Sequence, residues 1–248
     1  MDPHALGEIL VGTRNLLRHH LRIGLRNYPE RSRFTALLRG RSGSLATQER
    51  DEAPEKGVQP VALDIGEVWK AIRGCSTCPG RVHGPFLPGQ DLVGPARLVI
   101  VGDWCRMTPP SNTCWCARDE DDMLWRMMKA IGERPDHVYI TNVLKCPPGE
   151  AGDVAAAVRR CIVHLRREIA AVGAPVVLAM GEIAASALLG GGHPLIRMRG
   201  RLHKQVCEGR PVQIMPTFHP HFLLRHSEMK QAAWQDLLVV KKHLGKRR

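Results

Sequence analysis

The sequence of 248 residues predicts an α/β protein, a three-layer α/β/α sandwich around a parallel sheet. Four short apolar runs, of the kind buried on both faces of such a sheet, are expected as strands at 97–102, 138–142, 175–180 and 212–216. Segments with helical periodicity alternate with them, at about 63–73, 121–131, 153–172, 181–189 and 228–244. This alternation favours right-handed crossovers, and ligands then bind beyond the carboxyl ends of the strands.

The composition is that of a globular chain and excludes two classes of protein. Hydrophobic residues make up 44% and charged residues 24%, and no apolar run reaches the roughly 18–20 residues that cross a bilayer. The chain starts with an acidic residue, Asp2, and no long apolar segment, so a secretory signal is not expected. Eight cysteines in this context are typical of reduced thiols or metal ligands, and we expect a cytoplasmic protein.

Positive charge is concentrated near both ends of the chain. The net charge is +12: residues 193–248 hold 12 Lys/Arg against 3 Asp/Glu, residues 1–50 hold 9 against 4, and residues 51–192 hold 15 against 17. This distribution favours a polyanionic partner, with nucleic acid as the first interpretation and an anionic membrane surface as the alternative. The basic residues at 241–248 are equally typical of a solvated tail. Five others lie inside the folded pattern: Arg197, Arg199, Arg201, Lys204 and Arg210.

The N-terminal part of the chain is expected to lie outside the α/β domain. Residues 1–40 have a helical pattern in which a basic residue recurs every four positions, at Arg14, Arg18, Arg22 and Arg26. This stripe either contacts phosphates or forms the solvated side of an amphipathic helix. Residues 41–62 lack apolar periodicity and are typical of a linker, so the globular domain is predicted over 63–248.

Four cysteines have the spacing of metal ligands. Cys75 and Cys78 form a C-x-x-C pair on one turn, and Cys146 and Cys161 can complete a set of four thiolates. By count alone, zinc and a four-iron cluster fit equally well, and the alternative is that the four are small buried apolar residues. The remaining cysteines are expected to be packed or reactive thiols, or to form a second site: Cys105, Cys114, Cys116 and Cys207.

Taken in order, these four cysteines, the segment VYITNVLKCPP and the segment TFHPHFLLR at 217–225 resemble the uracil-DNA glycosylase superfamily. The most similar branch is the iron–sulfur group called family 4, and the resemblance covers about residues 67–244. It implies an α/β/α sandwich with a central four-stranded parallel sheet, in agreement with the predicted strands. It also implies that Cys75, Cys78, Cys146 and Cys161 hold a structural [4Fe-4S] cluster rather than zinc.

The resemblance further implies three residues that act on a uracil base. His219, in the HP motif, would donate to uracil O2, where negative charge grows as the glycosidic bond breaks. Asn142 would read the O4/N3 edge of the base and reject cytosine. Asp103 takes the place of the acidic residue in the first motif, where Gly102 is kept and the usual Pro-Gly is absent. The alternative for His219 and Asn142 is an ordinary turn residue.

Two features near residues 115–122 are ambiguous. The family's stacking Phe would fall near Cys116, and the neighbouring Trp115 could supply the aromatic face instead. The acidic run at 119–122 resembles a metal-binding cluster, but it directly precedes a helical segment. Carboxylates at that place are typical of a helix N-terminus, which is our preferred interpretation.

Residues late in the chain would contact DNA in this family. An apolar side chain of the segment after His219 would fill the gap left by a flipped base, and basic residues would contact phosphates. The alternative is that the apolar residues 222–224 begin a buried helix. The DNA-contacting candidates are Arg199, Gly200, Phe222, Leu223 and Arg225.

These observations predict a monomeric, nucleoid-associated DNA-repair glycosylase that flips uracil, or a related deaminated base, out of DNA and hydrolyses its N-glycosidic bond. No external cofactor enters this chemistry. A second hypothesis is an iron–sulfur DNA-binding protein on the same fold whose catalysis is reduced or lost, because the first motif is altered. A third is a zinc-stabilised adaptor whose basic helix recruits a partner.

Overall fold

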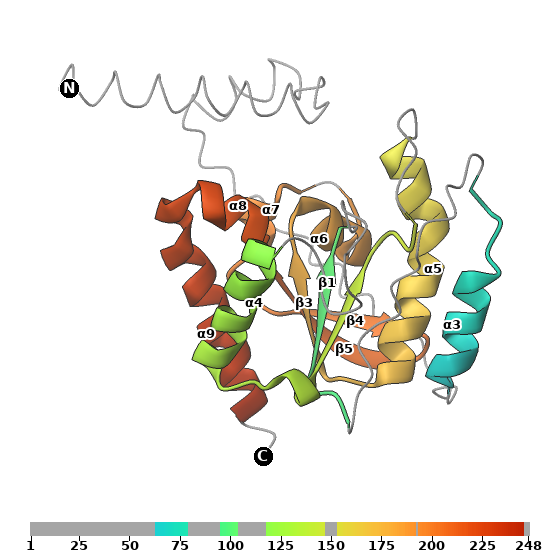
Figure 1. Cartoon of the computed structure of the whole chain (residues 1–248), viewed down its shortest axis with the longest axis horizontal. Coiled ribbons are helices and arrows are strands. Elements are labelled where there is room, and N and C mark those ends of the chain that lie inside the picture. The colour runs from blue at the N-terminus through green and yellow to red at the C-terminus, as the bar shows by residue number, and fades with distance from the viewer. Residues whose placement is uncertain (1–62, 79–94, 104–117, 147–152, 192, 246–248) are drawn as a thin grey trace, which may run out of the picture. The chain divides into compact units, whose positions relative to one another are not determined.

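The structure is a computed structural model that describes residues 63–78, 95–103, 118–146, 153–191 and 193–245, all within the unit Pro54–Arg248. In these residues one sheet has the strand order β2-β1-β3-β5-β4 (Figure 1). Its strands are β1 (Leu98–Gly102), β2 (Val138–Asn142), β3 (Val176–Met180), β4 (His203–Cys207) and β5 (Arg210–Thr217). Four of them run parallel, and β4 runs antiparallel to β5.

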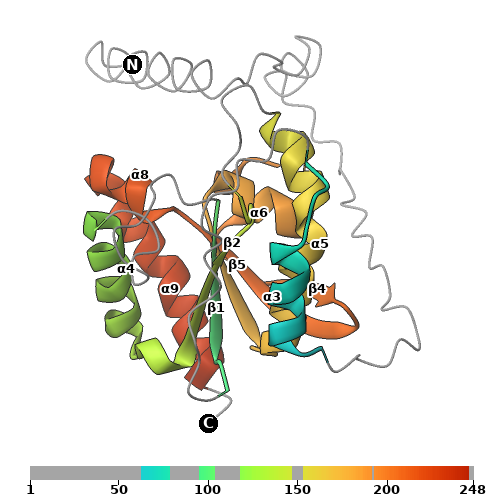
Figure 2. The same cartoon turned by 45° about the vertical axis from the view of Figure 1, so that its right-hand side comes forward.

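Helices cover both faces of the sheet and complete the three predicted layers (Figure 1, Figure 2). One face is covered by α3 (Ile65–Arg73), α5 (Val154–Val172) and α6 (Glu182–Leu189), and the other by α4 (Arg118–Ile131) and α9 (Lys230–Gly245). Two short helices, α7 (Leu195–Met198) and α8 (Pro220–Arg225), precede β4 and follow β5. Single 3-10 turns are formed by Pro135–His137 and Ser227–Met229.

The centre of the sheet is apolar because it is covered on both sides. Every residue of β1, β2 and β3 is buried, and residues 98–101 have no exposed surface. The chain is poor in aromatic residues, and methionines take part of their place: Met128, Met180 and Met215 are fully buried. Their flexible side chains can fill the irregular spaces between the sheet and the helices.

Local signals in the sequence set the helix ends. Asp64 caps α3, and Asp153 accepts two backbone hydrogen bonds at the start of α5, which ends at Gly173 with φ of 71°. The acidic run at 119–122 lies in the first turns of α4, where it meets the positive end of the helix dipole. The prediction that these carboxylates begin a helix is therefore confirmed.

The predicted fold class is confirmed, with one difference in the sheet. The four predicted strands form its parallel part, and the unpredicted strand β4 adds a fifth, antiparallel strand at one edge. β4 escaped prediction because it is a polar edge strand in which only Cys207 is buried. The two-residue turn to β5 has positive φ at Glu208 and Gly209, which matches the twist of a hairpin without the usual Asn-Gly or Asp-Gly sequence.

Two further predictions concern membrane-spanning helices and the N-terminal part of the chain. No helix among the described residues has both the length and the apolar character needed to span a bilayer. The basic helix predicted within residues 1–40 and the linker at 41–62 lie outside the described residues. The three proposed segments of the chain therefore remain a prediction.

Candidate active site

The carboxyl ends of the parallel strands place the predicted site residues along one edge of the sheet. Two pairs mark these ends, Gly102 with Asn142 and Met180 with Thr217. Asp103 directly follows β1, and His219 follows β5 by two residues. Neighbouring strands lie about 4.8 Å apart, so three spacings separate the backbones of β2 and β5 by about 14 Å. Two side chains and a flat base between them can fill that gap.

Asp103 is held at the N-terminus of α6. Its Oδ1 accepts a hydrogen bond of 3.2 Å from the backbone N–H of Ala184 and so supplies the cap that the N-cap residue, Gly181, cannot. Gly181 has φ of 100°, and a Cβ there would lie 3.3 Å from the same oxygen. The helix N-terminus favours negative charge at this point. The carboxyl end of the sheet therefore carries a half-buried carboxylate, one oxygen of which caps α6.

Asn142 ends β2 with its side chain only 8% exposed. No described residue donates a hydrogen bond to its Oδ1. A buried acceptor without a partner costs about 1–3 kcal/mol, so a ligand that donates a hydrogen bond to this atom would remove an unfavourable term. The backbone carbonyl of Asn142, by contrast, accepts a hydrogen bond of 2.6 Å from Lys145 Nζ.

His219 is the N-cap of α8, and this role sets its tautomer. Its Nδ1 accepts a hydrogen bond of 3.1 Å from the backbone N–H of His221. A ring nitrogen that accepts carries no proton, so the proton of the neutral imidazole is on Nε2. The half-buried ring can therefore donate from Nε2, as the sequence prediction requires of it.

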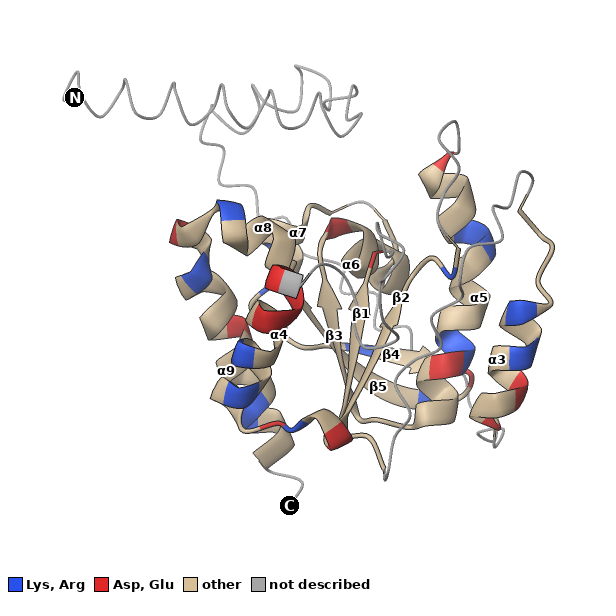
Figure 3. Ribbon diagram, viewed as in Figure 1, with Lys and Arg blue, Asp and Glu red and all other residues tan. Residues whose placement is uncertain are grey.

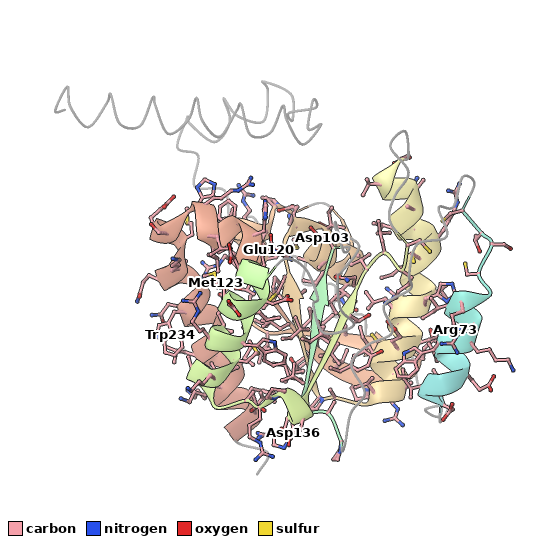
Figure 4. The ribbon with its side chains drawn as sticks, viewed as in Figure 1. Arg73, Asp103, Glu120, Met123, Asp136 and Trp234 are labelled. Carbon is pink, nitrogen blue, oxygen red and sulfur yellow. The ribbon has the colours of Figure 1, made fainter. Side chains whose placement is uncertain are left out.

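A second histidine in this region, His221, forms a contact that the sequence analysis did not predict. Nδ1 of His221 lies 2.5 Å from Oε1 of Glu120, which belongs to the first turn of α4 and lies at the same end of the molecule as Asp103 (Figure 4). Both side chains are partly buried. The pair joins α8 to α4 at the residue whose backbone N–H donates to His219 Nδ1. Because 101 residues separate its partners, no local pattern could have revealed it.

Lys145 and Glu168 form a buried ion pair that the sequence analysis also missed. Their side chains are 3% and 0% exposed, and the ammonium group contacts the carboxylate directly. Lys145 Nζ also donates to Thr141 Oγ1 at 2.7 Å. The lysine itself could have indicated this pair, because a charge in the middle of a buried, otherwise apolar segment requires a partner.

The guanidinium group of Arg199 has an internal partner rather than an open position on the surface. It forms two hydrogen bonds, of 3.1 and 3.0 Å, with the fully buried carboxylate of Asp236 on α9 and also donates to the carbonyl of Ala232. It lies 5.2 Å from the centre of the Phe218 ring. Gly200 beside it is exposed with φ of 87°. The predicted DNA contact by Arg199 is not tested by this arrangement.

Helix α8 divides the predicted DNA-contacting segment into an inner and an outer side. Leu223 is 1% exposed and packs in the core, whereas Phe222 is half-buried and stacks with Phe218 and His226. Leu224 is 42% exposed, and Arg225 next to it is also exposed. The outward apolar residue of this helix is therefore Leu224, which was not among the predicted DNA-contacting residues.

The four predicted ligand cysteines lie on the flank formed by α3, the end of β2 and α5. Cys75 and Cys78 follow α3, Cys146 follows Lys145, and Cys161 lies on α5; all four are half-buried. Burial raises the pKa of the Cys161 thiol, and Cys146 and Cys78 raise it further by a smaller amount. In the described residues no three ligands already converge on one point, but the all-sulfur donor set suits zinc or an iron–sulfur cluster.

Other predicted features fall outside the site or outside the described residues. Cys207 is buried at the end of β4, and burial raises its pKa to about 11, which is typical of an inert packed thiol. The stacking candidates Trp115 and Cys116 lie outside the described residues, as do Cys105 and Cys114.

The fold and this edge define a class of protein: an α/β/α sandwich with a carboxylate, an amide and an imidazole at the carboxyl ends of its parallel strands. The family model of the uracil DNA glycosylase superfamily matches residues 92–238, and the chain belongs to this family. The match spans every strand of the sheet and all three of these polar side chains. The resemblance predicted from the sequence motifs is thereby confirmed.

Relatives from three organisms agree with the type-4 branch of the family. A type-4 uracil-DNA glycosylase of Archaeoglobus fulgidus is 27% identical over 202 residues, which cover 74% of this chain and 94% of the relative. Those of Thermotoga maritima and Pyrobaculum aerophilum are 26% and 25% identical and cover 72% and 71% of this chain, and 94% and 93% of the relatives.

Proposed function

We propose that the protein is a DNA-repair glycosylase that flips uracil, or a related deaminated base, out of DNA and hydrolyses its N-glycosidic bond. The observation that carries this proposal is the fixed tautomer of His219 at the carboxyl edge of the sheet. As the glycosidic bond breaks, negative charge grows on uracil O2, and a positioned N–H donor stabilises it. The names of the type-4 relatives support uracil in DNA as the substrate.

Asn142 supplies base recognition in this proposal. Its amide presents one acceptor and one donor, which match the N3–H and O4 of uracil but not the N3 and amino group of cytosine. The unpartnered Oδ1 supports this role because N3–H of uracil would satisfy it. A mismatched base would leave the same buried oxygen unsatisfied, which is an effective basis for rejection.

Asp103 supplies negative charge near the sugar, where positive charge develops, and can orient the attacking water. Its hydrogen bond with Ala184 keeps the carboxylate at the edge of the sheet. Gly102 before it is buried and leaves the strand end free of a side chain. These two residues are what remains of the family's first motif.

DNA would lie over the end of the sheet at α8 and α7. The exposed basic residues there are Arg197, Arg201 and Arg225. Leu224, with 42% of its side chain exposed beside Arg225, is better placed than the buried Leu223 to fill the gap left by a flipped base. Figure 3 shows further Lys and Arg residues along α5 and α9, on opposite faces of the sheet. Such groups contribute affinity without reading sequence.

We propose further that Cys75, Cys78, Cys146 and Cys161 hold a [4Fe-4S] cluster, with zinc as the alternative. The sulfur-only donor set supports this assignment, as does the position of Cys161 Sγ, which accepts from the backbone N–H of the residue before Cys146. When bound, the metal centre would crosslink α3, the end of β2 and α5, and so contribute to folding rather than to bond cleavage. The residues of the sheet edge carry all the proposed chemistry.

Incubation with uracil-containing oligonucleotides tests the function. Single- and double-stranded substrates should yield alkali-labile abasic sites, and identical oligonucleotides with cytosine should not. Asp103→Asn and His219→Ala should each reduce the product. Activity on no deaminated base would contradict the proposal.

A second candidate function is supported by one observation. Because Asp103 already caps α6, its carboxylate is partly committed to the fold, which favours a DNA-binding protein with reduced catalysis. This candidate predicts salt-sensitive binding of DNA without abasic sites, whereas the glycosylase predicts both. The same oligonucleotides distinguish the two.

The metal assignment has its own test. Protein purified without oxygen should contain iron and show broad visible absorbance. Cys161→Ala should lose both, while Cys207→Ala, which removes a packed thiol, should keep them. Zinc without iron in the wild-type protein would contradict the cluster.

A further inference from the structure

We propose that the buried Lys145–Glu168 pair is a positioning device that holds Asn142 in place for reading the base and connects it to the cysteine site. This inference rests on the proposed function, because it concerns how the base-reading residue is oriented. Lys145 contacts no substrate in this scheme. It acts through the backbone of Asn142.

The ammonium group of Lys145 uses its three donors on three different partners. It donates to the carboxylate of Glu168, to Thr141 Oγ1 at 2.7 Å and to the backbone carbonyl of Asn142 at 2.6 Å. Two of these partners are the last two residues of β2. The lysine side chain therefore folds back onto the end of β2 and holds the backbone carbonyl of the base-reading residue by a hydrogen bond.

Glu168 anchors this arrangement to two helices. It accepts hydrogen bonds from Thr141 Oγ1 at 2.9 Å and from the hydroxyl of Tyr139 at 3.2 Å, and it belongs to α5. Tyr139 in turn accepts a hydrogen bond of 3.1 Å from Trp69 Nε1 on α3. The network thus fastens the end of β2 to α5 and α3, the two helices that carry or precede three of the four cysteines.

Stability alone does not account for a buried ion pair of this kind. Removing two charges from water is so unfavourable that well-packed apolar residues often stabilise a protein as much or more. An apolar pair could not, however, donate a hydrogen bond to the carbonyl of Asn142. No described residue donates to the Oδ1 of Asn142, so the backbone that carries the side chain contributes to the position of this acceptor. Lys145 holds that backbone.

The same residue also contacts the cysteine site. The backbone N–H of Lys145 donates to Cys161 Sγ at 3.4 Å, and Cys146 is the next residue. Lys145 therefore touches a candidate metal ligand through its backbone and the base-reading residue through its side chain. One residue therefore connects the cysteine site with Asn142.

The test replaces the pair by apolar residues of similar size in Lys145→Met/Glu168→Leu. Binding is measured to oligonucleotides that contain 2′-fluoro-deoxyuridine, whose glycosidic bond resists hydrolysis, or the matching 2′-fluoro-deoxycytidine. We expect the double variant to lose about 10- to 100-fold of the preference for uracil over cytosine, because a small displacement of a positioning group has effects of that size. Its kcat on uracil should fall more than its KM rises.

A matched control is the ion pair Arg97–Glu133, in which the carboxylate is also buried but lies near the amino ends of the strands. The double variant Arg97→Met/Glu133→Leu should change the unfolding temperature and keep the preference for uracil. Lys145→Gln/Glu168→Gln is a second test variant that keeps polar groups but shortens the donor. It should fold and lose the preference.

The outcomes separate the two proposals. A wild-type protein without preference for uracil overturns the proposed reading of uracil by Asn142 and this inference together, whereas the proposed function fails only if no deaminated base is released. A wild-type preference that persists in a folded Lys145 double variant overturns only the inference. If neither double variant folds, the pair serves folding, and the positioning role is rejected.

Discussion

Strands β2 and β5 each end in a cluster of a threonine, a buried carboxylate and a basic residue, which we call a clamp. The two clamps lie on opposite faces of the sheet. Each carries a threonine hydroxyl that donates to a fully buried carboxylate: Thr141 to Glu168 on α5, at 2.9 Å, and Thr217 to Asp236 on α9, at 2.8 Å. Each carboxylate is paired with one basic residue, Lys145 or Arg199.

The two clamps differ in where the spare donors of the cation point. Lys145 returns to the strand end and holds the carbonyl of Asn142, whereas Arg199 donates to Ala232 on α9 and lies over Phe218. The first clamp therefore acts on a proposed base-reading residue. The second secures the last helix against the sheet, and the neighbouring His219 is oriented separately by its cap. In this proposal, similar buried ion pairs serve recognition on one side and packing on the other.

The largest expected effect is the loss of stability in Arg199→Met. This change leaves the buried Asp236 carboxylate unpaired and should reduce the free energy of unfolding by about 3–5 kcal/mol, measured by chemical denaturation. The preference for uracil over cytosine should remain, since this clamp does not hold Asn142. A loss of that preference would remove the distinction between the clamps.

His219→Ala should reduce the single-turnover rate on uracil-containing DNA about 100- to 1,000-fold, because it removes the proposed donor to O2. The change also removes the cap of α8, so His219→Ser is the matched variant: serine restores a capping oxygen but no donor in the place of Nε2. Both variants should be equally inactive, and only the first should lose stability. An active serine variant would show that the cap, rather than the imidazole donor, matters.

A smaller effect is expected from Glu120→Gln, which weakens the contact between α4 and α8. The pair with His221 is partly exposed, so we expect about a fivefold decrease in the single-turnover rate with an unchanged preference for uracil. Asp122→Asn, an exposed neighbour on the same helix, is the control. Equal rates in both variants would mean that the pair does not position His219.

The smallest effect concerns the pH dependence of stability. Burial raises the pKa of the Asp236 carboxyl above its ordinary value of 3.8. A carboxyl with a higher pKa in the folded protein stabilises the fold at low pH, and this contribution is lost as the pH rises through the folded value. The unfolding free energy of the wild-type protein relative to Asp236→Asn should therefore fall as the pH rises above 3.8. A rise would show that Arg199 outweighs burial.

The sequence was sufficient to predict the layers and the edge of the sheet that carries the site. Buried parallel strands produce continuous apolar runs, and their ends are marked by Asp103, Asn142 and the HP motif. Strand β4 was missed because an exposed edge strand lacks that pattern. Which apolar residue of α8 faces outward could not be predicted, because burial within a short helix depends on its rotation against the core, which six residues do not specify.

The pairs that connect distant elements were beyond sequence reasoning. Glu120 and His221 are separated by 101 residues, Arg199 and Asp236 by 37, and Lys145 and Glu168 by 23. None of these separations follows a helical or strand repeat, so only the folded chain brings the partners together. The internal partner of Arg199 could not be predicted for the same reason.

The turn between β3 and α6 limits how this protein can change through evolution. Gly181 has a backbone conformation that side chains rarely adopt, and the space above it is taken by the carboxylate of Asp103. Replacing the carboxylate alone would therefore not make position 181 mutable, because the backbone would still require glycine. A substitution at 181 would strain the backbone, so we expect libraries aimed at new base preferences to find their variation at other positions.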